Sequence, residues 1–197
     1  YGFPRELYSV RYEPPGAPAV AEHAAGLVAA TGLAVSKDGM RGIDHGGWVP
    51  LKYLYPGADI PTALLSIQSD RGARHHFEIG RALAPLRDEG VLVLASGGIV
   101  HNLRELDWQG RSAAPLPWAV AFNDWIASRV ESGAVDELLD YGRFAPEPRR
   151  SHPTEEHFDP FFVALGAGGT PARRIALGFD MGSLGMDAYL FGAPAER

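Results

Sequence analysis

A histidine follows a glycine turn at the end of an apolar run near the middle of the chain. Residues 91–95 read Val-Leu-Val-Leu-Ala, a Ser-Gly-Gly turn follows at 96–98, and His101 lies just beyond it. The run predicts a buried parallel strand, and the glycines let the backbone turn sharply at its carboxyl end. In open α/β sheets ligands bind at that end. His101 is therefore a candidate metal ligand or general acid/base; the alternative is a loop histidine bonded to a backbone carbonyl.

Two further histidines stand beside carboxylates. His45 follows Asp44 and precedes Gly-Gly-Trp; Asp44 could orient the ring only if the backbone turned back, and the alternative is a polar turn. His157 follows two glutamates, the second of which is Glu156. This pair could belong to a metal site, but Pro153 with acids in the next positions is also ordinary chemistry for the start of a helix. Taken alone, the residues favour the structural alternative in both places.

The other four histidines carry no chemical signal of their own. His23 lies in an alanine-rich segment, His152 follows two arginines, and His75 and His76 stand near the start of a predicted helix. We expect all four to be structural or on the surface, with His75 and His76 on the solvent side. The chain has no Walker loop and no Gly-x-Ser-x-Gly elbow, and Ser-Gly-Gly at 96–98 is not the Gly-x-Gly-x-x-Gly fingerprint, which disfavours dinucleotide binding.

Composition limits the classes of protein to consider. The 197 residues are 46% hydrophobic and 21% charged, with a net charge of −6 and no cysteine. Disulfides and thiolate metal sites are excluded, so a metal would need His, Asp or Glu ligands. The sequence has no basic run, which argues against nucleic acid as a partner. No apolar stretch approaches the roughly 20 residues that span a bilayer. No signal peptide follows Tyr1, which favours the cytoplasm; the chain lacks an initial Met, so an upstream signal stays open.

Helical and extended segments alternate along the chain. The pattern predicts helices at 18–31, 48–55, 73–89, 152–166 and, as two stretches, within 118–141. It predicts strands at 33–35, 62–67, 91–95, 173–179 and 186–191. Strand 62–67, helix 73–89 and strand 91–95 would form a right-handed βαβ unit. The expected fold is therefore α/β: one domain over 1–197 with a mostly parallel central sheet flanked by helices.

Taken together, these segments resemble one family: the LigB-type (class III) extradiol ring-cleavage dioxygenases, in the bacterial 4,5-DOPA dioxygenase branch. Asp-His-Gly at 44–46 combined with Ser-Gly-Gly-x-x-His-Asn-Leu at 96–103 is specific. The other matching stretches, in family order, are 1–4, 12–18, 42–48, 59–61, 65–67, 86–91, 95–104, 117–119, 153–158 and 181–184.

The resemblance implies an enzyme that opens the ring of a DOPA-like catechol with O₂, using one Zn(II) or Fe(II) ion per subunit. It implies that His101 belongs to the metal site and also serves as an acid/base. It further implies that His157 is a metal-site residue, that Glu156 is a second candidate nearby, and that His45 flanks the substrate. The expected catalytic residues are thus His45 and His101, and the expected metal ligands are His101, His157 and Glu156.

The chain departs from the family at the metal. Family members carry two more metal histidines in an N-terminal part, in Gly-His-Gly-Ser-Pro and Ser-Ala-His-Trp motifs, and neither motif occurs here. We therefore expect the sequence to lack that part. One alternative is a truncated, catalytically incompetent LigB-like domain that acts as a binding or interaction module. Another is a metal-dependent hydrolase on a similar scaffold, since a fold does not fix a function. The oligomeric state stays open, with a homo-oligomer among the alternatives.

Overall fold

The structure, a computed structural model, describes residues 4–110 and 114–192. It divides into two compact units, Tyr1–Ser66 and Ile67–Arg197. The first three residues of the family-like stretch at 1–4 lie outside the described residues. In the part of the chain that the structure describes, no helix is long and apolar enough to cross a membrane. The expectation of one domain over 1–197 stays a prediction.

The first unit consists mainly of short helices joined by extended chain. The 3₁₀ helix η1 covers Arg5–Ser9, α1 covers Pro18–Ala29 and α2 covers His45–Leu54. Pro18 stands at the first position of α1, where its missing N–H costs nothing. The expected helix at 18–31 is thus confirmed. The strands expected at 33–35 and 62–67 do not form; Thr62 makes only an isolated parallel bridge.

Helix α2 begins three residues earlier than the sequence suggested, at His45 instead of Trp48. The side chain of Asp44 accepts a hydrogen bond from the backbone N–H of Gly47 at 3.3 Å and so caps the helix. The two glycines in the first turn are poor helix formers and indicated a loop. The cap outweighs that propensity, and it places His45 at the first helical position.

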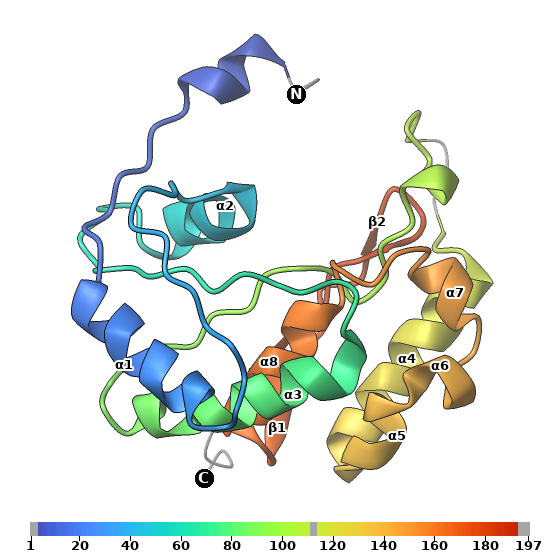
Figure 1. Ribbon diagram of the computed structural model, residues 1–197. Coiled ribbons are helices and arrows are strands. Elements are labelled where there is room, and N and C mark those ends of the chain that lie inside the picture. Colours follow the sequence, from blue (N-terminus) through green and yellow to red (C-terminus); the bar gives the residue numbers. More distant parts are fainter. Residues whose placement is uncertain (1–3, 111–113, 193–197) are drawn as a thin grey trace, which may run out of the picture. The chain divides into compact units, whose positions relative to one another are not determined.

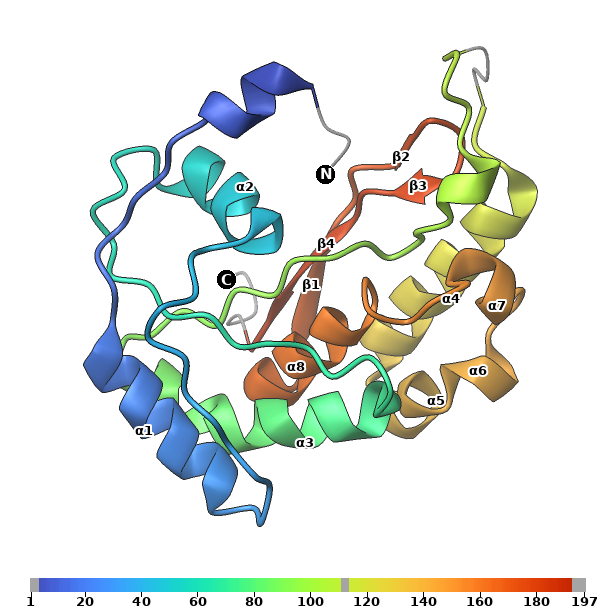
Figure 2. The ribbon, with the colours of Figure 1, turned by 45° about the horizontal axis from the view of Figure 1, so that its top comes forward.

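The second unit is built around α8, Asp159–Gly168, whose residues are almost all buried. Helix α3, Gly72–Leu83, packs along it (Figures 1 and 2). The helices meet backbone to backbone: a Cβ on Gly80 would overlap the carbonyl oxygen of Val163, and one on Gly166 would overlap that of Phe77. The predicted helix at 73–89 is thus largely confirmed, although its last turns become the 3₁₀ helix η2, Ala84–Arg87, which contains Pro85.

Aromatic side chains fill the core between α8 and the helices that follow the central loop. Helix α4 covers Pro117–Ser132 and ends at Gly133, whose φ of 69° is the left-handed conformation that glycine favours. It contributes Phe122, which packs edge-on against Tyr141 and Phe158. The short helices that follow are α5 (Val135–Leu139), α6 (Tyr141–Phe144) and α7 (Pro148–Ser151). Two helical stretches within 118–141 are therefore confirmed.

The described residues do not form the mostly parallel central sheet that the sequence suggested. They form two antiparallel pairs, β1 (Ala172–Ile175) with β4 (Ala188–Phe191), and β2 (Phe179–Asp180) with β3 (Leu184–Gly185). The closing strands expected near 173–179 and 186–191 are thus confirmed in part, and the parallel arrangement is wrong for this part of the chain.

The segment 91–95 is the clearest case of this difference. Its backbone is extended but pairs with no strand among the described residues. Leu92 and Leu94 are 61% and 41% exposed, whereas Val91 and Val93 are half-buried. The apolar run thus predicted the extended conformation correctly, but a ladder also needs a neighbouring strand, which a local pattern cannot report.

The helix expected at 152–166 begins only at Asp159. Residues 153–158 form turns instead, and Phe158 at the start of the helix is fully buried. The proline and the acids that follow it were a correct sign of a nearby helix start, but they precede the helix instead of forming its first turn. Glu156 and His157 therefore lie on a loop, and the directions of their side chains are not set by a helical backbone.

Candidate active site

Two segments far apart in the chain run together and carry the candidate histidines. The turn segment 96–101, which bends at Ile99, ends at His101, and the loop at 152–158, directly after α7, carries His157. The backbone N–H of Gly98 donates to the carbonyl oxygen of His157 at 2.8 Å, and that of His101 donates to the carbonyl oxygen of Ser151 at 3.0 Å. These hydrogen bonds fix both ends of the turn to the loop.

Gly97 lets the two backbones come this close. A Cβ there would overlap the carbonyl oxygen of His157. At Gly98 the nearest atoms to such a Cβ would be 3.6 Å away, which is ordinary contact. The glycine that the approach requires is therefore the first of the two.

The rings of His101 and His157 stack face to face. Their centroids are 3.7 Å apart and their planes differ by 13°. Burial lowers the pKa of His101 below its ordinary value, and the neighbouring His157 lowers it further. His101 is therefore a neutral imidazole at neutral pH, able to accept a proton.

Glu156 orients the second ring of the stack. Its Oε1 lies 3.2 Å from Nδ1 of His157 and accepts a hydrogen bond from the hydroxyl of Thr154 at 2.8 Å. Burial alone would raise the pKa of Glu156, but hydrogen bonds from its own backbone N–H, Thr154 and His157 hold it below the ordinary value. An ionised carboxylate can only accept, so Nδ1 of His157 donates in this hydrogen bond, and Nε2 is the ring nitrogen that Glu156 does not engage.

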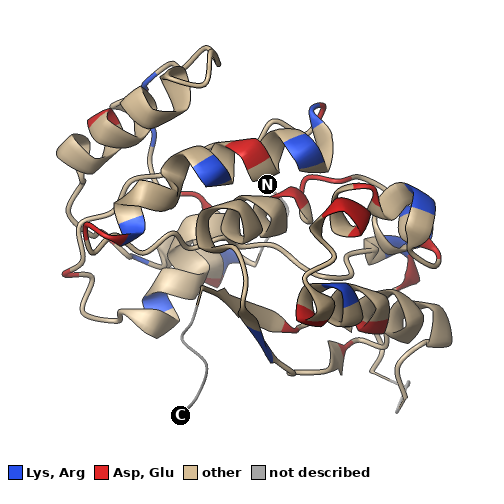
Figure 3. Cartoon of the chain, turned by 90° about the horizontal axis from the view of Figure 1, so that it is seen from below, with Lys and Arg blue, Asp and Glu red and all other residues tan. Residues whose placement is uncertain are grey.

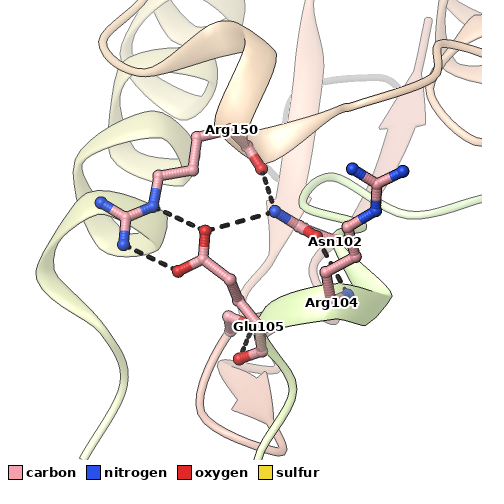
Figure 4. Close-up of polar contacts among 5 residues, drawn as sticks. Asn102, Arg104, Glu105 and Arg150 are labelled. Atoms are coloured by element: carbon pink, nitrogen blue, oxygen red, sulfur yellow. Dashed lines mark hydrogen bonds and ion pairs between the residues drawn. The ribbon is translucent and has the colours of Figure 1, made fainter.

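The chain just after His101 is anchored by a polar cluster (Figure 4). Arg150 donates to both carboxylate oxygens of Glu105, at 2.8 and 2.7 Å, and its guanidinium lies 4.7 Å from the ring centre of Trp118. Buried Asn102 donates to the carbonyl oxygen of Arg150 at 2.7 Å. The cluster joins η3, Leu103–Glu105, to the end of α7. The two segments that carry His101 and His157 are therefore joined both by backbone hydrogen bonds and by this cluster of side chains.

A buried pair anchors the start of α8, two residues after His157. His76 Nδ1 lies 2.8 Å from the carbonyl oxygen of Gly72 and 3.2 Å from Oδ1 of Asp159, and Nε2 accepts from the backbone N–H of Gln68 at 3.2 Å. The His76 and Asp159 side chains are 1% and 2% exposed. His76 is therefore structural, as expected, but its predicted place on the solvent side is wrong.

The donor types suit a first-row metal, but they do not yet form a metal centre. Two imidazoles and a carboxylate are the ligands that zinc and iron take. Within residues 4–110 and 114–192, no three His, Asp or Glu side chains gather as a ligand group. An imidazole binds a metal in the plane of its ring, at about 2.0–2.1 Å for zinc. Two face-to-face rings cannot both bind one ion in this orientation, so the stack brings the two imidazoles together without yet giving them ligand geometry.

His45 lies in the first unit, whereas the histidine stack belongs to the second. It is exposed, and Asp44 before it is engaged by Gly47 and by Arg41, whose Nη2 is 3.5 Å from Oδ2. The idea that Asp44 orients the His45 ring is thus replaced by a capping role. The role of His45 beside a substrate stays a prediction.

A hollow opens next to the site on the second unit. Its volume is about 550 Å³, and it is lined by Ser69, Arg149, His152, Pro153, Thr154, Glu155 and Glu156. The lining is mainly polar and belongs to the same loop that carries His157. Solvent or a polar ligand can therefore reach Glu156 from this side.

Sequence reasoning missed the residues that hold the histidines in place. Gly97, the Asn102–Glu105–Arg150 cluster and buried His152 all act through contacts between segments about 50 residues apart. His152 directly precedes the family-like stretch at 153–158, which is the only feature of the sequence that pointed toward it. The spacing of residues did not indicate a role for this histidine.

Comparison with known proteins identifies the family of this chain. Residues 2–191 match the family model described as the catalytic LigB subunit of aromatic ring-opening dioxygenase. The class is therefore an aromatic ring-cleaving dioxygenase, and enzymes of this family are non-haem and metal-dependent. The chain belongs to the LigB family. The resemblance inferred from the sequence is confirmed.

Relatives match along most of the chain. The 4,5-DOPA dioxygenase extradiol of Beta vulgaris is 41% identical over 96% of this chain and 71% of its own length. The protein of that name from Escherichia coli K12 is 42% identical over 94% and 69%. A crystal structure of an uncharacterized E. coli K12 protein superimposes with a TM-score of 0.79 at 40% identity, covering 93% of this chain and 76% of that one. These matches favour an enzyme over a non-catalytic module.

Proposed function

We propose that the protein opens the ring of a DOPA-like catechol by extradiol cleavage. The reaction adds both atoms of O₂ to the catechol, breaks a ring carbon–carbon bond beside the hydroxyls and yields a ring-opened semialdehyde acid. The observation that carries the proposal is that His101, His157 and Glu156 come together from two distant segments, with His101 beside His157 and Glu156 bonded to the His157 ring. The names of the relatives from Beta vulgaris and E. coli support the substrate class.

We propose His101, His157 and Glu156 as this chain's contribution to the metal site. His157 offers Nε2 as the ligand atom, and Glu156 fixes that orientation through Nδ1, as carboxylates do for metal-binding histidines. When bound, a Zn(II) or Fe(II) ion would supply the positive charge that favours a deprotonated catechol. One ion per subunit is expected, and further donors are needed beside these three.

His101 and His45 are proposed to handle the substrate protons. His101 is held neutral beside the loop, so an imidazole nitrogen can take a proton from a catechol hydroxyl and return it to the product. His45, exposed at the start of α2, would serve as a second proton carrier. A cytoplasmic location, the absence of a nucleic-acid partner and the oligomeric state stay predictions from the sequence.

Oxygen uptake and metal analysis together test this proposal. Protein supplied with Fe(II) or Zn(II) should consume O₂ with L-DOPA or a related catechol and form a yellow semialdehyde. His157→Ala should lower the bound metal and His101→Ala the turnover, while His75→Ala, a histidine outside the site, should change neither. Fully metallated protein that leaves a broad panel of catechols intact would contradict the proposed activity.

A further inference from the structure

A third histidine, His152, lies buried near His101 and His157, the two histidines of the proposed function. It is 4% exposed, and its ring stacks on Phe158 with the centroids 4.6 Å apart and the planes at 13°. Phe122 packs against it from another side at 5.6 Å. His152 takes no part in the proposed reaction itself.

One nitrogen of His152 is bound to the turn that leads to His101. Nε2 lies 2.8 Å from the carbonyl oxygen of Ile99. A carbonyl can only accept, so Nε2 carries the proton and donates. Burial lowers the pKa of His152 to about 4, so the ring is neutral at neutral pH. The ring thus takes one defined tautomer.

The other nitrogen has no such partner. Nδ1 is buried and has no hydrogen-bond partner among the residues that the structure describes. A bare buried lone pair costs free energy, so an apolar residue would serve better if the position only filled the core. The histidine is therefore best explained by its donor, which reaches Ile99.

That hydrogen bond completes a set of three between the two segments. Gly98 donates to the carbonyl oxygen of His157, His101 donates to the loop at Ser151, and His152 donates back to the turn between them. Of the three, only the bond from His152 comes from a side chain. A substitution can therefore remove it without touching the backbone.

We propose that His152 is a positioning residue that sets the stack of His101 on His157 by anchoring the Ile99 carbonyl. The proposal rests on the proposed function in taking those two histidines as the site. Without the anchor, the Ile99 carbonyl is no longer held, although the carbonyl oxygen of Val100 still accepts from the backbone N–H of Gly185 at 3.1 Å. We expect the Ile99 peptide to turn and to shift the His101 ring from its place over His157. His152 itself contacts neither substrate nor metal in this role.

Paired substitutions separate this role from simple packing. In His152→Gln the amide nitrogen is as many bonds from Cβ as Nε2 is, so it can still donate to Ile99; in His152→Asn it is one bond shorter. His152→Leu keeps an apolar filling and removes the donor. Ile126→Val, which trims a fully buried α4 residue of the same core, is the control for a general loss of stability.

The first readout is the NMR signals of the His101 and His157 ring C–H groups, which stacking shifts upfield. His152→Leu and His152→Asn should move these signals downfield, while His152→Gln and Ile126→Val should leave them near their wild-type positions. The second readout is kcat/KM with a catechol, which should fall about ten- to a hundred-fold in the Leu and Asn variants because the reacting groups are misplaced.

Each outcome decides the question. If the Leu variant does not fold, the contrast between Gln and Asn carries the test. Wild-type ring signals in both the Leu and Asn variants, or in Asn alone if Leu does not fold, would overturn the positioning role. Ring signals displaced equally in the Gln and Asn variants would also overturn it, because the donor would then not matter. The signals are measured without turnover, so they remain decisive even if no catechol proves to be a substrate.

Discussion

Gly97 lies directly against the carbonyl oxygen of His157, with no room for a Cβ between them. The contact brings together the turn before His101 and the loop before α8, which are about 60 residues apart in the chain. The backbone bond from Gly98 to the same carbonyl oxygen depends on it. The stack of His101 on His157 therefore depends on a glycine at position 97, because any side chain there would push the two segments apart.

Substituting Gly97 should damage both stability and activity. Gly97→Ala forces the two backbones apart, which we expect to cost about 1–3 kcal/mol of unfolding free energy. Because the stack moves with them, kcat/KM should fall about ten- to a hundred-fold. The matched control is Gly98→Ala, where the nearest contacts are 3.6 Å and little should change. Urea unfolding and steady-state kinetics measure the two effects; equal behaviour of both variants would count against the contact.

The close packing of α3 on α8 predicts that alanine substitutions at two helical glycines change the stability in opposite directions. Gly166→Ala places a methyl group on the carbonyl oxygen of Phe77 and should destabilise the protein by about 1–3 kcal/mol. Gly26→Ala in α1 meets nothing within 4 Å, so it should stabilise by about 0.5–1 kcal/mol through helix propensity. Thermal unfolding should move the melting temperature in opposite directions, and a loss at both positions would be inconsistent with this packing.

Asp187 should make stability depend on acid pH. It accepts hydrogen bonds from Asn123, Arg174 and the backbone N–H groups of Leu177 and Gly178. Burial alone would raise its pKa, but these donors outweigh burial and hold the pKa below its ordinary value. The stabilisation is therefore fully present above the ordinary pKa of about 3.9 and is lost as the pH falls from there through the folded-state value.

Asp187→Asn should thus lower the unfolding free energy by about 2–4 kcal/mol at neutral pH, because it leaves buried donors and the Arg174 charge poorly matched. The difference from wild type should shrink as the pH falls below about 4. Asp124→Asn is the control: its carboxylate is 3.6 Å from Nη2 of Arg174 but 62% exposed, so we expect a change within about 0.5 kcal/mol. Urea titrations over a pH series would show whether the gap narrows.

The sequence predicted the helices better than the strands, and the reason is physical. The α3 and α4 segments carry their own helical patterns, and the proline and glycine at the ends of α4 mark its limits. A strand is completed only by a neighbour, so the apolar segment 91–95 could be recognised as extended but not as paired. In Figure 3 the ribbon positions of Asp and Glu and those of Lys and Arg are interspersed along the elements, which agrees with the absence of a basic run in the sequence.

The candidate site was predicted by its family-like motifs and not by its geometry. His101, Glu156 and His157 were named from the sequence, and the structure brings these three together. The residues that arrange them, Gly97 and His152, act across a distance in sequence that no periodicity spans. The candidate residues could be named from local motifs, whereas the contacts that hold them could not.

The most direct test of the central claim is the fate of isotopically labelled oxygen. Protein supplied with metal is incubated with a catechol under ¹⁸O₂, and the product is reduced at once so that its aldehyde oxygen does not exchange with water. Extradiol ring opening predicts a product that carries both labelled atoms, formed by wild type and Gly98→Ala and strongly reduced in His101→Ala. A ring-opened product without label from O₂, or the same labelled yield from His101→Ala, would contradict the account.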